Sequence, residues 1–325
     1  RVLEAAGVAG LGGVLGTVST AVAAQEWTEV SSPTGKTLTG VEHTAEGTYA
    51  SGNNGLVIRR KDDGEWTVVT DDGLGGSSKT IKGSGLNGDG SRYWMVGNSG
   101  VLGEFDVASN TLYDHSKPMG ISNQFRSISV RGETGNERLY IGMSSGQVVV
   151  GERNGGGQNF NWMISDTGSG YTVRASDFTI GNGTGFVCTN GGEVFRTDDG
   201  ANSWSYVGYD RSQTSYSALM ADDGDPRQVY VGGGSGRLLR RDCDCGNWTP
   251  TKVGSKRVHS LEADNNGEHY LGAGASGRVY ERSENSAGWN VTNTSSGNAL
   301  LRAAPATDDE SVDVVVGKSG TILER

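Results

Sequence analysis

The sequence predicts an all-β chain that closes into a ring of seven four-stranded sheets, a seven-bladed β-propeller. The main observation is a repeated pattern, in which a β-type run ends in small residues, turns at a glycine and continues as a second β-type run. This glycine recurs every 41 to 46 residues, at positions 55, 100, 146, 192, 236, 277 and 320. Such a period in an all-β sequence is typical of propellers, with one blade per repeat. A regularly placed tryptophan and an incomplete last repeat support the same fold.

Each repeat divides into four short strands. In the third repeat we expect them at Phe125–Val130, Leu139–Gly142, Gln147–Glu152 and Asn159–Ile164, because these runs are rich in β-branched and aromatic residues and are bounded by Gly, Asn, Asp or Ser. The glycine between the second and third strands supplies the positive φ that a tight hairpin needs.

The fourth strand of most repeats carries a large aromatic side chain, which we expect to pack against the neighbouring sheet. The residues at this place are Trp66, Tyr113, Trp162, Trp204, Trp248 and Trp289.

The two ends of the repeat region complement each other. The seventh repeat stops at Arg325 after its third strand, and a tryptophan-containing strand stands alone at Trp27–Ser31. We therefore predict that Trp27–Ser31 completes the blade made by residues 299–325, which closes the ring and removes exposed strand edges.

Residues 25–325 are accordingly interpreted as one propeller domain, and residues 1–24 as a separate segment. The first residues are small and apolar, and Ala21-Val22-Ala23-Ala24 offers a cleavage site of the signal-peptidase kind. The start at Arg1 resembles the end of a twin-arginine export signal. The sequence thus favours an exported or surface-held protein; the alternative is a retained apolar arm that associates with a membrane or a partner.

Charge and composition exclude several classes of function. The net charge of −10 argues against a nucleic-acid partner and is compatible with adaptation to high salt. The three cysteines, Cys188, Cys243 and Cys245, cannot all pair with one another, and the last two offer too few ligands for a metal. The four histidines show no metal-ligand spacing and no phosphate-binding loop is present, so neither a metal nor a cofactor is expected.

Acidic turns precede the aromatic residue in several repeats. The best example is Thr197-Asp-Asp-Gly-Ala-Asn-Ser-Trp204, which resembles the Asp-box (BNR) repeat, although Ala201 stands where that family has glycine. The resemblance implies that the aspartate caps its own turn and has a structural role.

The repeat as a whole resembles the propellers of the photosystem II stability and assembly factor type. The matching segments are Phe125-Arg126-Ser127-Ile128 and Leu301-Arg302-Ala303-Ala304, together with the glycine hairpins and the acidic turns. The resemblance covers about residues 26–325 and implies a seven-bladed, non-enzymatic recognition domain with an arginine patch, without implying a photosynthetic role.

The first strands of the repeats contain one candidate site. When these strands are aligned on their small residue, one column of the alignment is rich in cations. We expect its members to converge at one mouth of the ring, where they would attract carboxylates, phosphates, acidic peptides or glycans. The alternative is that each arginine pairs with Asp177, Asp222 or Glu262 on an adjacent blade. The column holds Thr39, Lys82, Arg126, Arg174, Tyr216, His259 and Arg302.

These features favour a non-enzymatic recognition or assembly propeller that binds a protein or an anionic ligand at a basic face. Two alternatives stay open. One is a structural or attachment protein of a cell or virus surface. The other is a sialidase-like glycoside hydrolase, in which Tyr216 and Glu262 would form the nucleophile pair; against it stand the count of seven blades and the regular spacing of the arginines.

Overall fold

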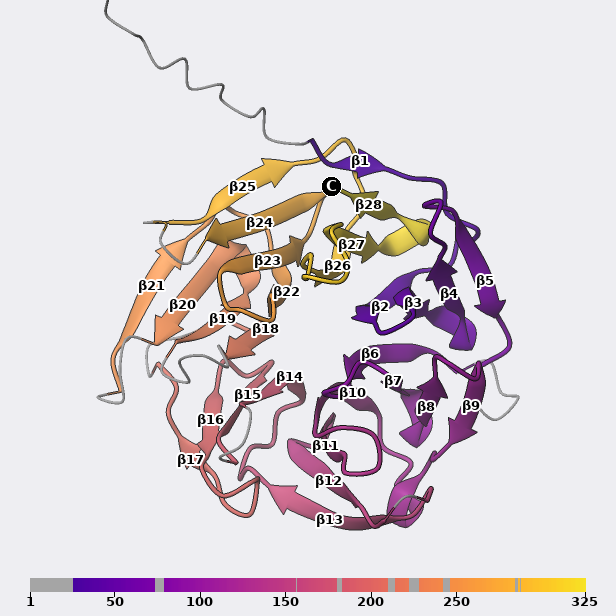
Figure 1. Ribbon diagram of the computed structural model, residues 1–325. Helices are drawn as coiled ribbons and strands as arrows, with labels where there is room; N and C mark the ends of the chain where they lie inside the picture. The colour runs from indigo at the N-terminus through magenta and orange to yellow at the C-terminus, as the bar shows by residue number, and fades with distance from the viewer. Residues whose placement is uncertain are drawn as a thin grey trace, which may run out of the picture.

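The computed structural model describes residues 26–73, 79–155, 157–179, 183–209, 214–221, 228–241, 246–283, 286 and 288–325. Within them, seven four-stranded antiparallel sheets surround a central opening, and each sheet is one blade (Figure 1). The predicted seven-bladed propeller is therefore confirmed. The proposed export segment, residues 1–24, lies outside the described residues.

The chain builds each blade from its innermost strand outwards. The strands of the first three blades are β2 (Leu38–Thr44), β3 (Gly47–Gly52), β4 (Val57–Arg60) and β5 (Trp66–Thr70); β6 (Ile81–Leu86), β7 (Arg92–Gly97), β8 (Leu102–Asp106) and β9 (Thr111–Asp114); β10 (Phe125–Arg131), β11 (Arg138–Met143), β12 (Gln147–Arg153) and β13 (Phe160–Asp166).

Blades four to six follow the same order, and the predicted strands of blade three agree with β10–β13 to within two residues at each end. The strands of blades four to six are β14 (Val173–Phe178), β15 (Gly185–Thr189), β16 (Val194–Thr197) and β17 (Ser205–Tyr206); β18 (Tyr216–Ala221), β19 (Val229–Gly233), β20 (Arg237–Arg241) and β21 (Trp248–Lys252); β22 (Val258–Ala263), β23 (His269–Gly274), β24 (Arg278–Ser283) and β25 (Asn290–Asn293).

The seventh blade joins the two ends of the chain. Its order is β26 (Leu300–Ala304), β27 (Val314–Gly317), β28 (Ile322–Glu324) and β1 (Thr28–Glu29), so the first strand of the described chain is the outer strand of the last blade (Figure 1). Thr28 pairs with Glu324 and Glu29 pairs with Leu323. This confirms the predicted closure of residues 299–325 by the strand that follows Trp27.

Side chains strengthen this seam. The Arg325 guanidinium lies 4.9 Å from the centre of the Trp27 ring. Across the next gap, Glu324 accepts hydrogen bonds from Arg60 Nε at 3.0 Å and from Trp66 Nε1 at 2.7 Å. Blade seven is therefore bound to blade one by polar contacts as well as by apolar packing.

The core is divided among the gaps between blades. Each of the seven gaps holds one cluster of buried apolar side chains drawn from the two flanking sheets. Trp248 of blade five packs on Phe186 and Val194 of blade four, and Trp66 packs on Ile322 of blade seven. The predicted packing of the fourth-strand aromatic residue on the neighbouring sheet is confirmed in these blades.

The acidic turn of blade four has the expected geometry. Asp199 accepts hydrogen bonds from the Ser203 backbone at 2.9 Å and from its hydroxyl at 2.6 Å, so the aspartate caps its own turn. Ala201 adopts φ +69, the left-handed conformation that favours glycine.

No helix within the described residues is long and apolar enough to cross a membrane.

Candidate functional site: a basic cavity at one end of the central channel

All seven innermost strands begin in the same way. Their first residue is fully buried in an inter-blade cluster, and together these residues form an apolar ring at one end of the channel. Between the first and third residues the pairing with the second strand shifts by one, which marks a β-bulge. The apolar ring consists of Leu38, Ile81, Phe125, Val173, Tyr216, Val258 and Leu300.

The second residue of each strand is the bulged one, and its side chain enters the channel. These residues line a cavity of about 170 Å³, together with Arg302. A bulge places two residues opposite one and thereby redirects a side chain, so the repeated bulge explains why one residue from every blade reaches the axis. The bulged residues are Thr39, Lys82, Arg126, Arg174, Ser217, His259 and Leu301.

The structure corrects the predicted column at two places. Tyr216 does not line the cavity; it belongs to the apolar ring, is 0 % exposed and packs in the cluster between blades four and five. The residue of blade five that faces the axis is Ser217. Because Ser217 and Ala218 are both small, the sequence does not show which of them follows the bulge.

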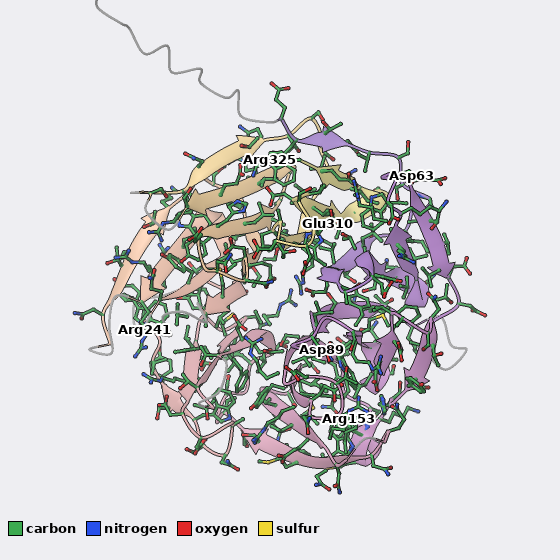
Figure 2. All side chains as sticks on the ribbon, viewed as in Figure 1. Asp63, Asp89, Arg153, Arg241, Glu310 and Arg325 are labelled. Carbon is green, nitrogen blue, oxygen red and sulfur yellow. The ribbon has the colours of Figure 1, made fainter. Side chains whose placement is uncertain are left out.

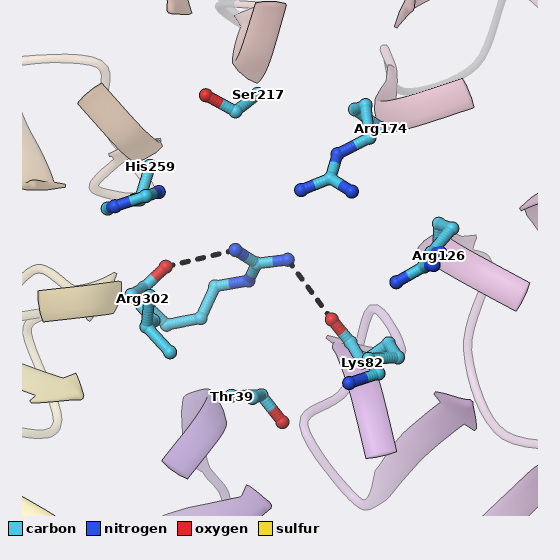
Figure 3. A pocket seen from close by; sticks show the side chains of 8 residues that line it. Thr39, Lys82, Arg126, Arg174, Ser217, His259 and Arg302 are labelled. Atoms are coloured by element: carbon cyan, nitrogen blue, oxygen red, sulfur yellow. Dashed lines mark hydrogen bonds between the residues drawn. The ribbon is translucent and has the colours of Figure 1, made fainter. Parts of the chain in front are cut away.

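Arg302 reaches the cavity by another route than its predicted neighbours. Leu301 is the bulged residue of blade seven, and Arg302 stands at the next position, where the other blades have a small residue. Its guanidinium extends across the channel and donates to the Leu301 carbonyl at 3.0 Å and to the Lys82 carbonyl of blade two at 3.4 Å (Figure 3). It faces Arg174 and Arg126 in the same view. The small residues in the other blades are Gly40, Gly83, Ser127, Ala175, Ala218 and Ser260.

The cations of the cavity lack ion-pair partners within the part of the chain that the structure describes. Among the described residues, none of the ion pairs includes Lys82, Arg126, Arg174 or Arg302. Arg126 donates to Gln124 through Nη2, and its Nε is buried with no hydrogen-bond partner among the residues that the structure describes. The cavity therefore concentrates positive charge that no ion pair among the described residues neutralises.

The alternative, in which the arginines of the column pair with acidic residues of adjacent blades, is not observed for Asp177 or Glu262. Asp177 binds Arg131 instead, at 2.9 Å. Glu262 forms no ion pair with the cations of the cavity, and Asp222 lies outside the described residues.

The pKa values reflect this crowding of like charges. Burial, followed by the charges of Arg126 and Arg174, lowers the pKa of Lys82. Burial and the charges of Arg257, Arg302, Arg174 and Lys318 lower the pKa of His259 to about 4. At neutral pH the His259 imidazole is therefore uncharged and available to accept or donate a hydrogen bond.

The residues required by the glycosidase alternative are not assembled. Tyr216 lies in the core and Glu262 faces a different cavity, so the proposed nucleophile pair does not form.

Within the described chain, one group of three potential metal ligands lies together: His269, Glu281 and Asp313. Arg325 already fills the space for a cation there, since its guanidinium binds Glu281 and donates to Asp313 at 2.6 Å. This cluster is a structural ion-pair network at the seam. Cys188 is buried without a disulfide, and Cys243 and Cys245 lie outside the described residues.

No protein-family model and no curated protein sequence matches this chain. Its fold is similar to several solved structures. One is YCF48 bound to D1 peptide, with a TM-score of 0.72, 14% identity, and 92% of this chain and 96% of that chain covered. A second is YCF48 from Cyanidioschyzon merolae, with a TM-score of 0.70 and 15% identity, covering 92% of this chain and 98% of that chain. A third is a chain of the mitotic checkpoint complex, with a TM-score of 0.75 and 13% identity, covering 91% of this chain and 92% of that chain.

At these identities the similarity establishes the fold alone. The likeness to the two YCF48 structures is a likeness of the propeller fold, and membership of the Asp-box family is not shown.

Proposed function

We propose that this chain is a non-enzymatic recognition propeller that binds an anionic group of a protein partner at the basic cavity. One observation carries the proposal: the cavity gathers Lys82, three arginines and His259, and no carboxylate is among its lining residues. Burying cations without counter-charges costs free energy. A bound anion would remove that cost, which gives the site its driving force.

The size of the cavity limits the ligand. Small-molecule sites usually occupy roughly 300–1,000 Å³, and this cavity measures about 170 Å³. It therefore suits one carboxylate, phosphate or sulfate group, presented by an acidic peptide or a glycan, better than a whole nucleotide. Arginine suits such groups because its guanidinium can donate two parallel hydrogen bonds.

The similar structures support a protein as the partner. In one of them YCF48 is bound to D1 peptide, and another is a chain of the mitotic checkpoint complex. Each of these chains is thus found together with another polypeptide, which makes polypeptide binding a reasonable use of the same fold here.

We place this activity outside the cytoplasm or at a surface, on the strength of the apolar segment at residues 1–24. The mass of the mature chain tests this location. Loss of about 24 residues supports export with cleavage; an intact Arg1 would support a retained arm instead.

Binding is tested by isothermal titration with inorganic phosphate, acetate and a hexa-aspartate peptide at low salt. The double substitution Arg126→Ala with Arg174→Ala should weaken binding of the preferred anion at least tenfold. Affinity should also fall as salt is raised, because the interaction is between charges.

A matched control removes two exposed cations from the outer strands of blade five, Arg237→Ala with Lys252→Ala. Both double variants lose the same net charge, so only a local effect separates them. Equal affinity in the two variants would show that the basic cavity is not the binding site.

A further inference from the structure

The two ends of the channel carry opposite charge. The basic cavity has no carboxylate among its described lining residues. At the other end, a wider cavity of about 780 Å³ is lined by the later residues of the innermost strands and by the turns that follow them. Eight carboxylates accompany two arginines there, Arg131 and Arg302. Asp89 and Glu310 lie on two sides of the central opening in Figure 2. The carboxylates are Glu42, Asp89, Glu133, Asp177, Glu262, Asp264, Asp309 and Glu310.

Further cations lie at the rim of the basic cavity. Arg257 precedes the innermost strand of blade six, and its Nη1 donates to the Ser215 carbonyl at 3.1 Å and to Ser217 Oγ at 3.3 Å. Lys318 is exposed in the turn between β27 and β28, and its charge, like that of Arg257, helps to lower the pKa of His259. Neither cation belongs to an ion pair among the described residues. An anion at the cavity therefore meets positive charge at its rim as well.

The chain carries an acidic turn at the opposite end, in the connection between β26 and β27. This connection, residues 305–313, has nine residues, against two to seven in the corresponding connections of the other blades. We call it the blade-seven turn. Asp308 and Asp309 are exposed at its tip and form no ion pair within the part of the chain that the structure describes. The blade-seven turn thus presents two adjacent carboxylates to the surroundings.

Hydrogen bonds hold the blade-seven turn in one shape. The Thr307 backbone N–H donates to the Glu310 carbonyl at 2.8 Å, and the Glu310 N–H donates to Thr307 Oγ1 at 3.1 Å. At the base, Asp313 accepts from the Ala306 N–H at 2.8 Å and from Arg325 Nη2 at 2.6 Å. A segment that is ordered before it binds loses little conformational entropy on binding, so the turn is prepared for docking.

The basic cavity and the blade-seven turn are complementary, but they cannot meet within one molecule. Innermost strand β26 runs from Leu301, which lines the basic cavity, to Ala304, which lines the wider cavity, so the two surfaces lie at opposite ends of the channel. A two-fold dimer would place like charges against each other at either end. A head-to-tail contact between copies instead brings the acidic end of one molecule to the basic end of the next.

We propose that the blade-seven turn of one copy docks at the basic cavity of a second copy of this chain. One carboxylate of Asp308 or Asp309 enters the cavity beside Arg126 and Arg174, and the other faces the cations of the rim. This inference rests on the proposed function, because it names the protein partner that supplies the anionic group. Since the contact is heterologous, each pair keeps one unused end of each kind, and association continues into open head-to-tail chains.

Sedimentation velocity of the full chain, from about 10 μM to about 1 mM, tests the association. Salt is kept at about 0.15 M, where charges more than about 8 Å apart are largely screened, so the net charge of −10 on each copy opposes contact only weakly. We expect the weight-average mass to rise steadily with concentration and to pass that of a dimer. A monomer at every concentration would overturn the inference, as would a mass that stops at the dimer.

Two complementary variants locate the contact. Asp308→Asn with Asp309→Asn alters the turn and leaves the cavity intact, whereas Arg126→Ala with Arg174→Ala alters the cavity and leaves the turn intact. Each variant alone should associate at least tenfold more weakly than wild type. An equal mixture of the two should form a dimer with one copy of each and grow no further, because only one intact turn and one intact cavity remain per pair. Wild-type association of either variant alone, or a mixture that stays monomeric, would refute the assignment.

A control variant and a peptide separate this inference from the proposed function. Asp62→Asn with Glu152→Gln removes two negative charges at exposed positions outside both cavities, and its association should stay within twofold of wild type; a tenfold loss there would contradict a contact at the blade-seven turn. Excess hexa-aspartate should return wild-type chains to monomers. Binding of hexa-aspartate by a wild-type protein that never associates would overturn the head-to-tail contact alone, whereas loss of both would overturn the proposed function as well.

Discussion

Replacing Glu42 with glutamine should make the protein more stable at high pH. The carboxyl lines the cavity of about 780 Å³ at the end of the channel opposite the basic cavity. Burial raises its pKa from 4.5 to about 7 despite the hydrogen bond from Ser84 and the charge of Arg302. Glutamine has nearly the same shape and carries no charge, so Glu42→Gln removes the cost of ionising this partly buried group.

The size and direction of the effect follow from the two pKa values. Below pH 4.5 the carboxyl is protonated in both the native and the unfolded chain, and it has no pH-dependent effect. Between pH 4.5 and 7 the unfolded chain releases the proton while the native chain retains it, so the free energy of unfolding falls as pH rises. Above pH 7 the loss is complete. A difference of about 2.5 pH units at 1.36 kcal/mol each gives about 3 kcal/mol.

The assay is denaturant unfolding at pH 4.5, 6 and 8, with Glu268→Gln as an exposed control. We expect the difference in unfolding free energy between Glu42→Gln and wild type to grow by about 3 kcal/mol from pH 4.5 to 8. The control should show no such growth. A difference that is the same at all three pH values would refute the reasoning, because it would mean that the native carboxyl ionises as freely as the unfolded one.

Two further predictions concern the seam and the basic cavity. Trp27→Ala should lower the free energy of unfolding by about 3–5 kcal/mol. The indole ring is 8 % exposed and packs between blades six and seven, where it contacts the Arg325 guanidinium. An unchanged melting temperature would contradict the closure of blade seven by the strand after Trp27. Arg302→Gln should raise the pKa of His259 above about 4, since Arg302 is one of the cations that lower it. Burial is the larger cause, so the pKa should stay below 6.5. Titration of the imidazole by NMR measures it, and no change would contradict the assigned position of the guanidinium.

The architecture was predictable because it depends on features that repeat. The glycine at each central hairpin fixes where a blade turns, and seven such glycines fix the number of blades. The unmatched strand after Trp27 could be placed for the same reason: a ring with one incomplete blade leaves only one edge for it to join.

The basic cavity was predicted in part. Lys82, Arg126, Arg174 and His259 follow the repeat and were located from spacing alone. The prediction that Tyr216 faces the channel was wrong. The strands were aligned on the small residue after the bulge, and Ser217 and Ala218 are both small, so the sequence does not show that Ser217 is the bulged residue. The acids at Glu42, Asp177 and Glu262 keep the same spacing three residues further on, and the same alignment could have revealed them.

The sequence by itself determined the ring, its seven blades and the joining of its ends, because these depend on local turn chemistry and on a period that any window of the chain displays. Only the tertiary structure decided the direction of Arg302 across the channel, the burial of Arg126 Nε without a hydrogen-bond partner among the described residues, and the separation of the channel into a basic and an acidic end. Those features arise from groups in different blades, brought together by closure of the ring, and their charges interact through space in a way that no single repeat encodes.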